Sequence, residues 1–514
     1  MNEKNHTIKS FNPATGEFLG EVPITTLEEI DEVVSKAKQA SESWTNTSFK
    51  ERAEFLLLMR DIIFKRSEEI ADLIVAEVGK PKIEAMLAEV FGVLDGLTYY
   101  AKNAERLLSD KTFRLPRFRG GSKTAITFQP MGVVAIIAPW NYPFYICLNG
   151  IMQSLITGNT VVLKPSDRTP LVGEKIKEIL SEVGLPKGVV SIVQGDGEIG
   201  KYLIKSDVNK ILFTGSVATG KKIMRDSAER LHSITLELGG SDPALILSDA
   251  RLDRASSGVV WGRFFNAGQS CCAVKRVYVV EDIASQFIDE VVSKVKEIRI
   301  GNGMDPKTEM GPLIDRRQLN TVQDQVEDAK SKGAEILCGG KQLKDLGELF
   351  YAPTILVNVN PSMRVLKEEV FGPVLPIVTV KNEEEGILQA NNTDFGLGAS
   401  VWTRDINRGW KIAKRLQAGT VWVNNVMVMA PQMPWKGIKY SGLGQTSSYF
   451  GLLDFTNIKT ICVSHGKKER EDHWYPYPES ILDFFRNTIR LSFSSHTTER
   501  LKALIKVMRR EGLR

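Results

Sequence analysis

Histidine is scarce in this chain, since only five of its 514 residues are histidine. They are His6, His232, His465, His473 and His496, and four of them lie near the ends of the chain. His232 falls on a polar turn before a predicted strand, where a surface position fits better than a role as a base. Proteases and many transferases with a cysteine nucleophile obtain its thiolate from a histidine. The sequence therefore argues against a Cys–His hydrolase.

Long apolar runs are also absent. No stretch reaches the roughly 18 to 20 uninterrupted apolar residues that span a bilayer, and Met1 to Thr25 is polar, without the apolar core of a secretory signal. Five cysteines without framework spacing are typical of free thiols in a reducing compartment. We expect a cytoplasmic protein with no metal site.

The length and the net charge limit the number of domains and the kinds of partner that are expected. A chain of 514 residues exceeds the size of one hydrophobic core, so two or three domains are expected. A net charge of +5 is modest and does not indicate nucleic acid as a partner. Residues 467–514 hold 11 Lys plus Arg against 7 Asp plus Glu, so +4 of the excess lies in the tail.

Apolar residues recur at helical spacing from Leu27 to Leu108, and the pattern then changes. Residues 112–130 are basic and partly β-like. Between Met131 and Gly215, short apolar strands alternate with helices; the strands are predicted at 133–138, 160–164, 189–193 and 210–214. This alternation is typical of parallel βαβ units, in which ligands bind at the carboxyl ends of the strands. A second strand and helix series follows from residue 235 to about 440.

Two adjacent cysteines, Cys271 and Cys272, follow the run Phe-Phe-Asn-Ala-Gly-Gln-Ser. A thiol in such a loop is the best candidate nucleophile of the chain, provided that other groups help to form its thiolate. With histidine excluded, carboxylates remain as candidate bases.

Glu237 and Asn141 are candidates for the base and for an oxyanion donor. Glu237 stands between leucines at a strand end, where apolar surroundings disfavour its charged form and suit a general base. A solvent-facing glutamate on an edge strand is the alternative. Asn141 lies in a loop stiffened by two prolines and could donate to an oxyanion, or simply be a turn asparagine.

Three segments are candidates for binding a dinucleotide. Residues 195–200 fit GxGxxG, but the acidic residue expected about 20 positions later is missing, so this run is better explained as a turn into a helix. Gly215 and Ser216 precede a helix whose free N–H groups attract phosphate, although Ser216 could be only a cap. Lys164 and Asp167 end another strand, either beside a ribose or in a solvated loop.

Together these segments resemble the aldehyde dehydrogenase superfamily, from Phe11 to about Val463. Six motifs stand in the family's order: Pro-Trp-Asn, Lys-Pro-Ser with an acid, Thr-Gly-Ser, Leu-Glu-Leu-Gly-Gly, Gly-Gln-x-Cys and the segment Glu368 to Pro373. Each is weak alone, and the ordered set is highly specific.

The resemblance implies a mechanism. Cys271 would attack the aldehyde, with Asn141 and the Cys271 N–H holding the oxyanion, and water activated by Glu237 would release the acid. It also implies a dinucleotide site formed by Trp140, Lys164, Asp167, Gly215, Ser216, Glu369 and Phe371. The family commonly has glutamate where this chain has Asp167, so NAD is favoured by charge and NADP stays open.

The fold implied is α/β, with a Rossmann-type cofactor domain (residues 1–111 and 131–237) and an α/β catalytic domain (238–440). A small β oligomerisation element (112–130 and 441–466) and an appended helical tail (467–514) complete it. A homodimer or homotetramer is expected. In the tail, an apolar stripe of Leu501, Leu504, Ile505 and Met508 lies among basic residues. It predicts contact with an anionic membrane surface, or docking on the body or a partner subunit.

The substrate is expected to be an apolar aldehyde, because Tyr142 and the Met427 to Trp435 loop would line its pocket. An acyl-transferring dehydrogenase, whose thioester is resolved by coenzyme A or phosphate, is the rival enzyme. A protein that only binds is the rival from another class. Glu237 argues against the first, and the set of Asn141, Glu237 and Cys271 argues against the second.

Overall fold

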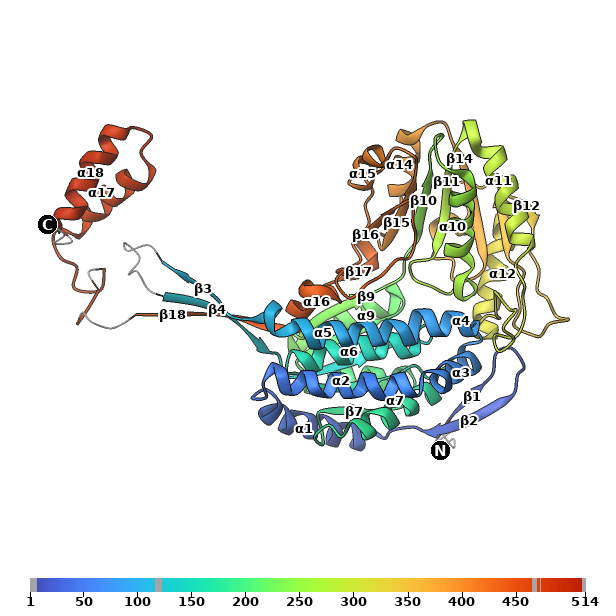
Figure 1. Ribbon diagram of the computed structural model, residues 1–514, viewed down its shortest axis with the longest axis horizontal. Helices are drawn as coiled ribbons and strands as arrows, with labels where there is room; N and C mark the ends of the chain where they lie inside the picture. Colours follow the sequence, from blue (N-terminus) through green and yellow to red (C-terminus); the bar gives the residue numbers. More distant parts are fainter. Residues whose placement is uncertain (1–6, 116–122, 465–468, 472, 511–514) are drawn as a thin grey trace. The chain divides into compact units, whose positions relative to one another are not determined.

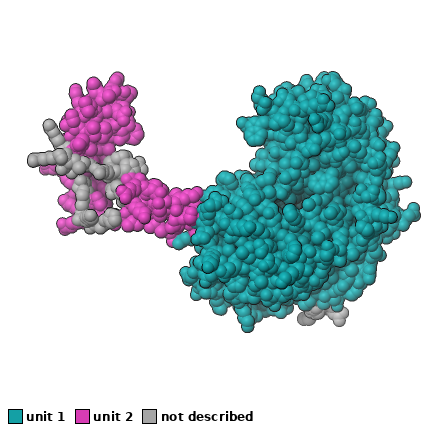
Figure 2. Space-filling model, viewed as in Figure 1, with its two compact units in different colours: residues 1–108, 129–457 teal, residues 109–128, 458–514 magenta. Residues whose placement is uncertain are grey.

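The structure is a computed structural model that describes residues 7–115, 123–464, 469–471 and 473–510. The chain divides into two compact units, coloured separately in Figure 2: residues 1–108 with 129–457, and residues 109–128 with 458–514. Both large sheets fall in the first unit. The assignment of separate cofactor and catalytic domains therefore stays a prediction.

The first unit begins with an antiparallel hairpin that the sequence pattern did not indicate, β1 (Thr7–Phe11) and β2 (Phe18–Pro23). Helices follow to residue 108, as predicted (Figure 1). Two of them begin with capping boxes, in which Thr26 and Ser48 accept from the backbone N–H three residues on. The helices are α1 (Leu27–Trp44), α2 (Phe49–Lys65), α3 (Ser67–Val78), α4 (Lys82–Glu84), the π-helix η1 (Ala85–Phe91) and α5 (Gly92–Leu108).

A six-stranded sheet has the order β17-β9-β8-β5-β6-β7, with all neighbours parallel except β17 against β9. Its apolar strands are buried on both faces by helices, which explains their continuous apolar runs. The strands are β5 (Val133–Ile137), β6 (Thr160–Lys164), β7 (Val190–Ile192), β8 (Lys210–Thr214), β9 (Ser233–Glu237) and β17 (Gly442–Leu443). The connecting helices are α6 (Pro143–Ile156), α7 (Pro170–Val183), α8 (Gly197–Lys205), α9 (Val217–Ser227) and the 3-10 helix η3 (Ala228–Arg230).

The candidate site residues follow the carboxyl ends of these strands. Asn141 comes after β5, Lys164 ends β6, Gly215 follows β8 and Glu237 ends β9. The GxGxxG run makes the turn into α8, where Asp196 is the N-cap and accepts from Glu198 N–H. This bears out its interpretation as a helix turn.

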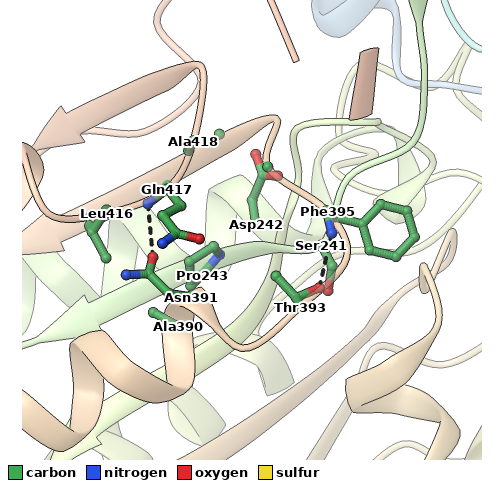
Figure 3. Close-up of a pocket in the computed structure, with 13 residues that line it drawn as sticks. Ser241, Asp242, Pro243, Ala390, Asn391, Thr393, Phe395, Leu416, Gln417 and Ala418 are labelled. Atoms are coloured by element: carbon green, nitrogen blue, oxygen red, sulfur yellow. Dashed lines mark hydrogen bonds between the residues drawn. The ribbon is translucent and has the colours of Figure 1, made fainter. Parts of the chain in front are cut away.

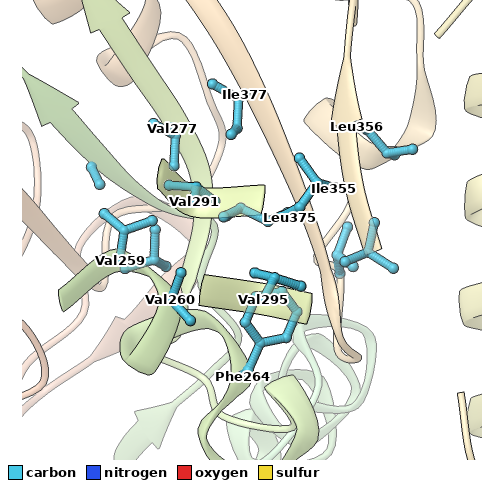
Figure 4. Packing of buried hydrophobic residues seen from close by; sticks show 14 of the residues in the cluster. Val259, Val260, Phe264, Val277, Val291, Val295, Ile355, Leu356, Leu375 and Ile377 are labelled. Atoms are coloured by element: carbon cyan, nitrogen blue, oxygen red, sulfur yellow. The ribbon is translucent and has the colours of Figure 1, made fainter. Parts of the chain in front are cut away.

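A seven-stranded sheet has the order β12-β13-β14-β11-β10-β15-β16. Valine, leucine, isoleucine and phenylalanine side chains fill the core on one of its faces, part of which is drawn in Figure 4. The strands are β10 (Asp242–Ile246), β11 (Val274–Val280), β12 (Glu335–Cys338), β13 (Thr354–Val357), β14 (Val374–Val380), β15 (Gly398–Trp402) and β16 (Thr420–Val423). The helices are α10 (Leu252–Phe264), η4 (Phe265–Gly268), α11 (Glu281–Lys296), α12 (Arg316–Ser331), α13 (Arg364–Lys367), α14 (Glu383–Asn391), α15 (Ile406–Ala413), η5 (Lys439–Ser441) and α16 (Ser448–Asp454).

The second unit contains the three-stranded sheet β18-β4-β3, which bears out the β-like character of the 112–130 stretch. The strands are β3 (Lys111–Arg114), β4 (Lys123–Pro130) and β18 (Thr456–Val463). A helical hairpin of α17 (Ile481–Phe493) and α18 (Thr497–Arg510) follows. Ala503 is buried in the hairpin, whereas the predicted apolar stripe lies on its outside, with exposures from 37% at Leu504 to 60% at Leu501. No described helix is long and apolar enough to cross a membrane.

Candidate active site

One cavity of the first unit, of about 380 Å3, contains both Cys271 and Glu237. It is enclosed by the end of β9, α5, α6, the 425–435 loop and the loop that holds Cys271 and Cys272, which is called the cysteine loop below. Tyr142, Met427 and Trp435 line it, as the sequence predicted. The structure therefore brings the candidate nucleophile and the candidate base into one space.

The cysteine loop is reached through a left-handed backbone turn. Asn266, Ala267 and Gly268 all have positive φ, at 53°, 51° and 74°. Alanine in this region costs about 1–2 kcal/mol, so the turn must be held by its surroundings. The Asn266 N–H donates to the buried Glu84 at 2.8 Å, and the Gly268 carbonyl accepts from the buried Arg263 at 3.0 Å.

The two thiols differ in exposure. Cys271 is half-buried, while Cys272 is 3% exposed, although both border the cavity. The thiols contact each other: this contact and burial raise the pKa of Cys271, and the same contact lowers the pKa of Cys272. Cys271 is therefore the more accessible residue of the two.

Asn141 lies against the cysteine loop. Its side-chain N–H donates to the Gln269 carbonyl at 3.1 Å, and its own carbonyl accepts from Asn266 Nδ2 at 3.1 Å. The residue is 4% exposed and is not part of the cavity wall. Its tertiary contacts go beyond those of a turn asparagine, and its role as an oxyanion donor stays a prediction.

A buried ion pair fixes the position of the Asn141 segment. Lys80 Nζ lies 2.7 Å from Glu89 Oε1 and donates to the Asn141 carbonyl at 2.7 Å, and both ionic side chains are fully buried. Glu89 also accepts from the Phe144 N–H at 2.9 Å, at the start of α6. The ammonium further lies 4.1 Å from the centre of the Tyr142 ring. This pair links α6, the Asn141 segment and the helices before them.

Glu237 lies at 5% exposure, and neither of its carboxyl oxygens has a hydrogen-bond partner among the described residues. Burial, and the nearby Asp454 to a lesser degree, raise the pKa of Glu237 well above its usual range. Strand β9 is paired on both sides, so the alternative of a solvent-facing residue on an edge strand is wrong. A carboxyl without a partner, in the same cavity as a thiol, has the chemistry of a candidate base for water.

The carboxyl ends of strands β6 and β8 fit a dinucleotide. Ser216 caps α9 and accepts from Thr219 N–H, so the first N–H groups of the helix are available to phosphate. A Cβ at Gly215 would lie 2.4 Å from the Phe213 ring, so only glycine fits there. Lys164 is 5% exposed and Asp167 is exposed, which places one cation and one accessible carboxyl at the end of β6.

Glu369, Phe371 and Trp140 also come together. The Phe371 and Trp140 rings meet edge to face at 5.7 Å between centroids. Glu369 accepts from the Gly240 N–H at 3.1 Å and pairs with Lys275 Nζ at 2.9 Å. The hydrogen bond from Gly240 to Glu369 thereby joins the Leu-Glu-Leu-Gly-Gly segment to the segment from Glu368 to Pro373.

Three buried cations at the site were not identified from the sequence. Besides Lys80, Lys275 donates to the Cys271 carbonyl at 2.7 Å, and Arg263 donates to the carbonyls of Val274, Gly268, Val370 and Gly372. Lys275 stands with Arg276 inside the apolar run of β11, and two cations in a buried strand are a usable signal. Lys80 and Arg263 carry no such signal.

His232 does not belong to the site. It precedes β9, whereas Glu237 ends that strand, and it is not part of the cavity wall. Burial lowers the pKa of its imidazole. Among the described residues, no group of three or more His, Cys, Asp or Glu side chains is arranged to hold a metal ion.

A second cavity beside Asp242 is not a ligand site. Figure 3 shows it between Ser241 to Pro243 and the loops around residues 391–395 and 416–418. Its volume of about 10 Å3 is that of a single water molecule.

Comparison with known proteins agrees with this geometry. The model of the aldehyde dehydrogenase family matches residues 1–461. The chain belongs to the aldehyde dehydrogenase family.

Two relatives with different named substrates have similar sequence identity to this chain. The chain is 37% identical over 461 residues to a mitochondrial succinate-semialdehyde dehydrogenase of Oryza sativa subsp. japonica, covering 89% of this chain and 86% of that protein. It is 38% identical over 485 residues to the peroxisomal aminoaldehyde dehydrogenase 1 of Pisum sativum, covering 93% and 96%.

Solved structures show the same fold. An aldehyde dehydrogenase from Bacillus cereus, in complex with NAD+, has a TM-score of 0.86 at 36% identity, covering 89% of this chain and 93% of that one. An NADP-dependent enzyme of E. coli also gives 0.86, at 34% identity and coverage of 89% and 95%. The predicted α/β fold is confirmed, and the protein is an NAD(P)-dependent, non-acylating oxidoreductase acting on aldehydes. The tail from residue 467 lies beyond the matched family model.

Exchange of each cysteine distinguishes the two thiols. Cys271→Ala is expected to lower the rate of aldehyde oxidation by about a thousandfold or more, because the nucleophile is lost. Cys272→Ala should retain most of the rate. Steady-state formation of reduced cofactor measures both, and equal losses would show that the nucleophile is assigned to the wrong sulfur.

Exchange of Lys80 tests the buried ion pair. Lys80→Met leaves Glu89 and the Asn141 carbonyl without their cation, and should lower the free energy of unfolding by about 3–5 kcal/mol. Urea denaturation measures this loss. Lys82→Met is the matched control: its partners Glu68 and Asp72 are surface residues, so a change within about 1 kcal/mol is expected. Equal small losses in both variants would contradict the role of Lys80.

Proposed function

We propose that Cys271, Glu237 and Asn141 carry out the oxidation of an aldehyde to its carboxylic acid. The observation that supports this most strongly is the shared cavity of Cys271 and Glu237, in which the carboxyl has no other partner among the described residues. Membership of the family gives the reaction class, and the roles of these three residues are our proposal.

The first step is attack of the Cys271 sulfur on the aldehyde carbon. The thiol proton passes to water, and the product is the oxyanion of a thiohemiacetal. The developing oxyanion needs donors in a dry site. The second side-chain N–H of Asn141 and the Cys271 backbone N–H are proposed for this, with Lys80 holding the Asn141 carbonyl from behind. NAD(P), when bound at the dinucleotide site, would supply the hydride acceptor, and Cys271 would then hold the acyl group as a thioester.

The second step is release of the acid. Glu237, once deprotonated, takes a proton from water, and the resulting hydroxide displaces the Cys271 thiolate from the acyl carbon. Because burial raises the pKa of Glu237 well above its usual range, its carboxylate is a stronger base than that of an ordinary glutamate. A base for water is not needed when coenzyme A or phosphate resolves the thioester, so Glu237 favours hydrolysis.

The dinucleotide is proposed to bind along the strand ends. Gly215 and Ser216 would hold its pyrophosphate, Lys164 and Asp167 the adenosine ribose, and Trp140, Glu369 and Phe371 the nicotinamide half. The carboxyl of Asp167 would repel a ribose phosphate, which favours NAD over NADP.

The aldehyde is proposed to have an apolar chain without a carboxylate. No lysine, arginine or histidine is found among the described residues that line the cavity. A substrate carboxylate, as in succinate or glutarate semialdehyde, would be desolvated there without a cation to pair with. Methionine and aromatic side chains suit a methylene chain instead.

The protein is further proposed to be a cytoplasmic homodimer or homotetramer. All five cysteines are free, as expected in a reducing compartment. Strand β18 is an edge strand whose apolar side chains Ile458, Ile461 and Val463 are 42–60% exposed, which is typical of a surface covered by another subunit.

The tail hairpin is proposed to contact an anionic membrane surface. Its exposed apolar side chains include Phe493, at 81%, and the stripe from Leu501 to Met508. Arg500, Lys502 and Lys506 are exposed on the same helix. An apolar face bordered by basic residues matches the chemistry of an anionic lipid interface.

A burst experiment tests hydrolysis through Glu237. In Glu237→Gln, one active-site equivalent of reduced cofactor should form rapidly, followed by a steady state about a hundredfold slower than wild type. The wild-type rate should rise with pH through the raised pKa of Glu237, and the variant should lose this dependence. Glu229→Gln, at an exposed position, is the control, and NAD and NADP are assayed in parallel. An unchanged steady state in Glu237→Gln would exclude its role as the base.

Co-sedimentation with vesicles tests the tail. The full chain should bind vesicles of anionic phospholipid, bind less in high salt because charge is screened, and ignore neutral vesicles. A chain shortened by residues 467–514 should lose this binding and keep its activity. Unchanged vesicle binding after the deletion would contradict membrane contact, and a changed oligomeric state instead would assign the hairpin to a partner subunit.

A further inference from the structure

We propose that Asp95 forms a cation subsite in the substrate cavity, so that the preferred aldehyde carries a positively charged nitrogen at the far end of its apolar chain. This inference rests on the proposed function, because it concerns the same cavity. It specifies the charge of the substrate, which an apolar cavity lining alone does not determine.

Asp95 lies on α5, half-buried, and lines the same cavity as Cys271. Glu237 is the only other acidic side chain in that lining, as far as the structure describes it. Asp95 has neither a hydrogen-bond nor an ion-pair partner among the described residues. By contrast, the buried acids Glu84 and Glu89 are each held by backbone N–H groups or a cation.

Aromatic side chains line the cavity that Asp95 borders. Tyr142, Tyr145, Trp261, Phe265 and Trp435 all line the cavity. Burial raises the pKa of Tyr145 to about 12, and the charge of Asp95 contributes, which indicates that these two side chains are close. A carboxylate together with ring faces is the combination that attracts alkylammonium groups.

The balance of charge in the cavity points the same way. An aldehyde that fills it displaces water from Asp95, and a carboxylate that loses water without gaining a partner is destabilised. A neutral chain leaves that cost in place, and an anionic one adds repulsion. A substrate with a terminal ammonium instead supplies the missing partner, so the site discriminates by charge as well as by shape.

Two isosteric aldehydes test the charge directly. One is trimethylammonio-butanal, and the other is its neutral analogue, in which a tert-butyl group replaces the trimethylammonio group. Wild-type enzyme is expected to show a KM for the cation lower by about tenfold, since the pair differs only in charge. Glutarate semialdehyde serves as the anionic comparison and should be the poorest substrate.

Asp95→Asn removes the charge and keeps the shape. The KM values for the cation and the neutral analogue should become equal, because the KM for the cation rises and the KM for the neutral analogue falls as the desolvation cost of the carboxylate is removed, while kcat stays unchanged. Glu105→Gln, on the exposed side of the same helix, is the matched control and should change neither. Calorimetric binding of both aldehydes to Cys271→Ala with NAD gives the same comparison without turnover.

The outcomes separate the two proposals. Equal KM values in wild type, or an equal effect of Asp95→Asn on both aldehydes, would overturn the cation subsite while oxidation of the neutral aldehyde still supports the proposed function. Failure to oxidise either aldehyde would instead count against the proposed function.

Discussion

The left-handed turn from Asn266 to Gly268 is the constraint on which the site depends. A backbone that is unfavourable for alanine persists because buried side chains hold both of its ends. Glu84, far along the chain, accepts from the Asn266 N–H, and Arg263, on the preceding helix, donates to the Gly268 carbonyl. The turn delivers Cys271 to the cavity beside the carboxyl end of β9. Neither large sheet alone could bring the thiol and Glu237 together.

Buried charged side chains hold this arrangement, and they differ in whether they have partners. Lys80, Arg263 and Lys275 are buried and spend their donors on carboxylates and backbone carbonyls, which locks the loops that meet at the thiol. Burial raises the pKa of Glu84 to about 8 and that of Glu77 to about 7, yet both accept backbone N–H groups. Glu237 and Asp95 lack such partners among the described residues. The same fold thus separates acids that support the structure from acids that are free to meet water or substrate.

Much of the scaffold could be predicted from the sequence. Strands β6 and β8 begin and end at the predicted residues, because buried parallel strands are short apolar runs between clear turn signals. Cys271 and Glu237 could be proposed because a thiol after Gly-Gln and an acid between leucines are unusual in themselves. Lys80 and Arg263 could not, since each also donates to backbone carbonyls of segments far along the chain, which only the fold brings near. Asp95 was missed for a related reason: an acid on a helix is ordinary until the cavity beside it is known.

The most direct test of the account is to locate the acyl group during turnover. Glu237→Gln enzyme is mixed with a neutral aldehyde and NAD, quenched in acid, digested, and the acylated peptide is sequenced by mass spectrometry. The account predicts a thioester on the sulfur of Cys271, formed only when both aldehyde and NAD are present. An acyl group on Cys272, or no covalent adduct at all, would contradict it.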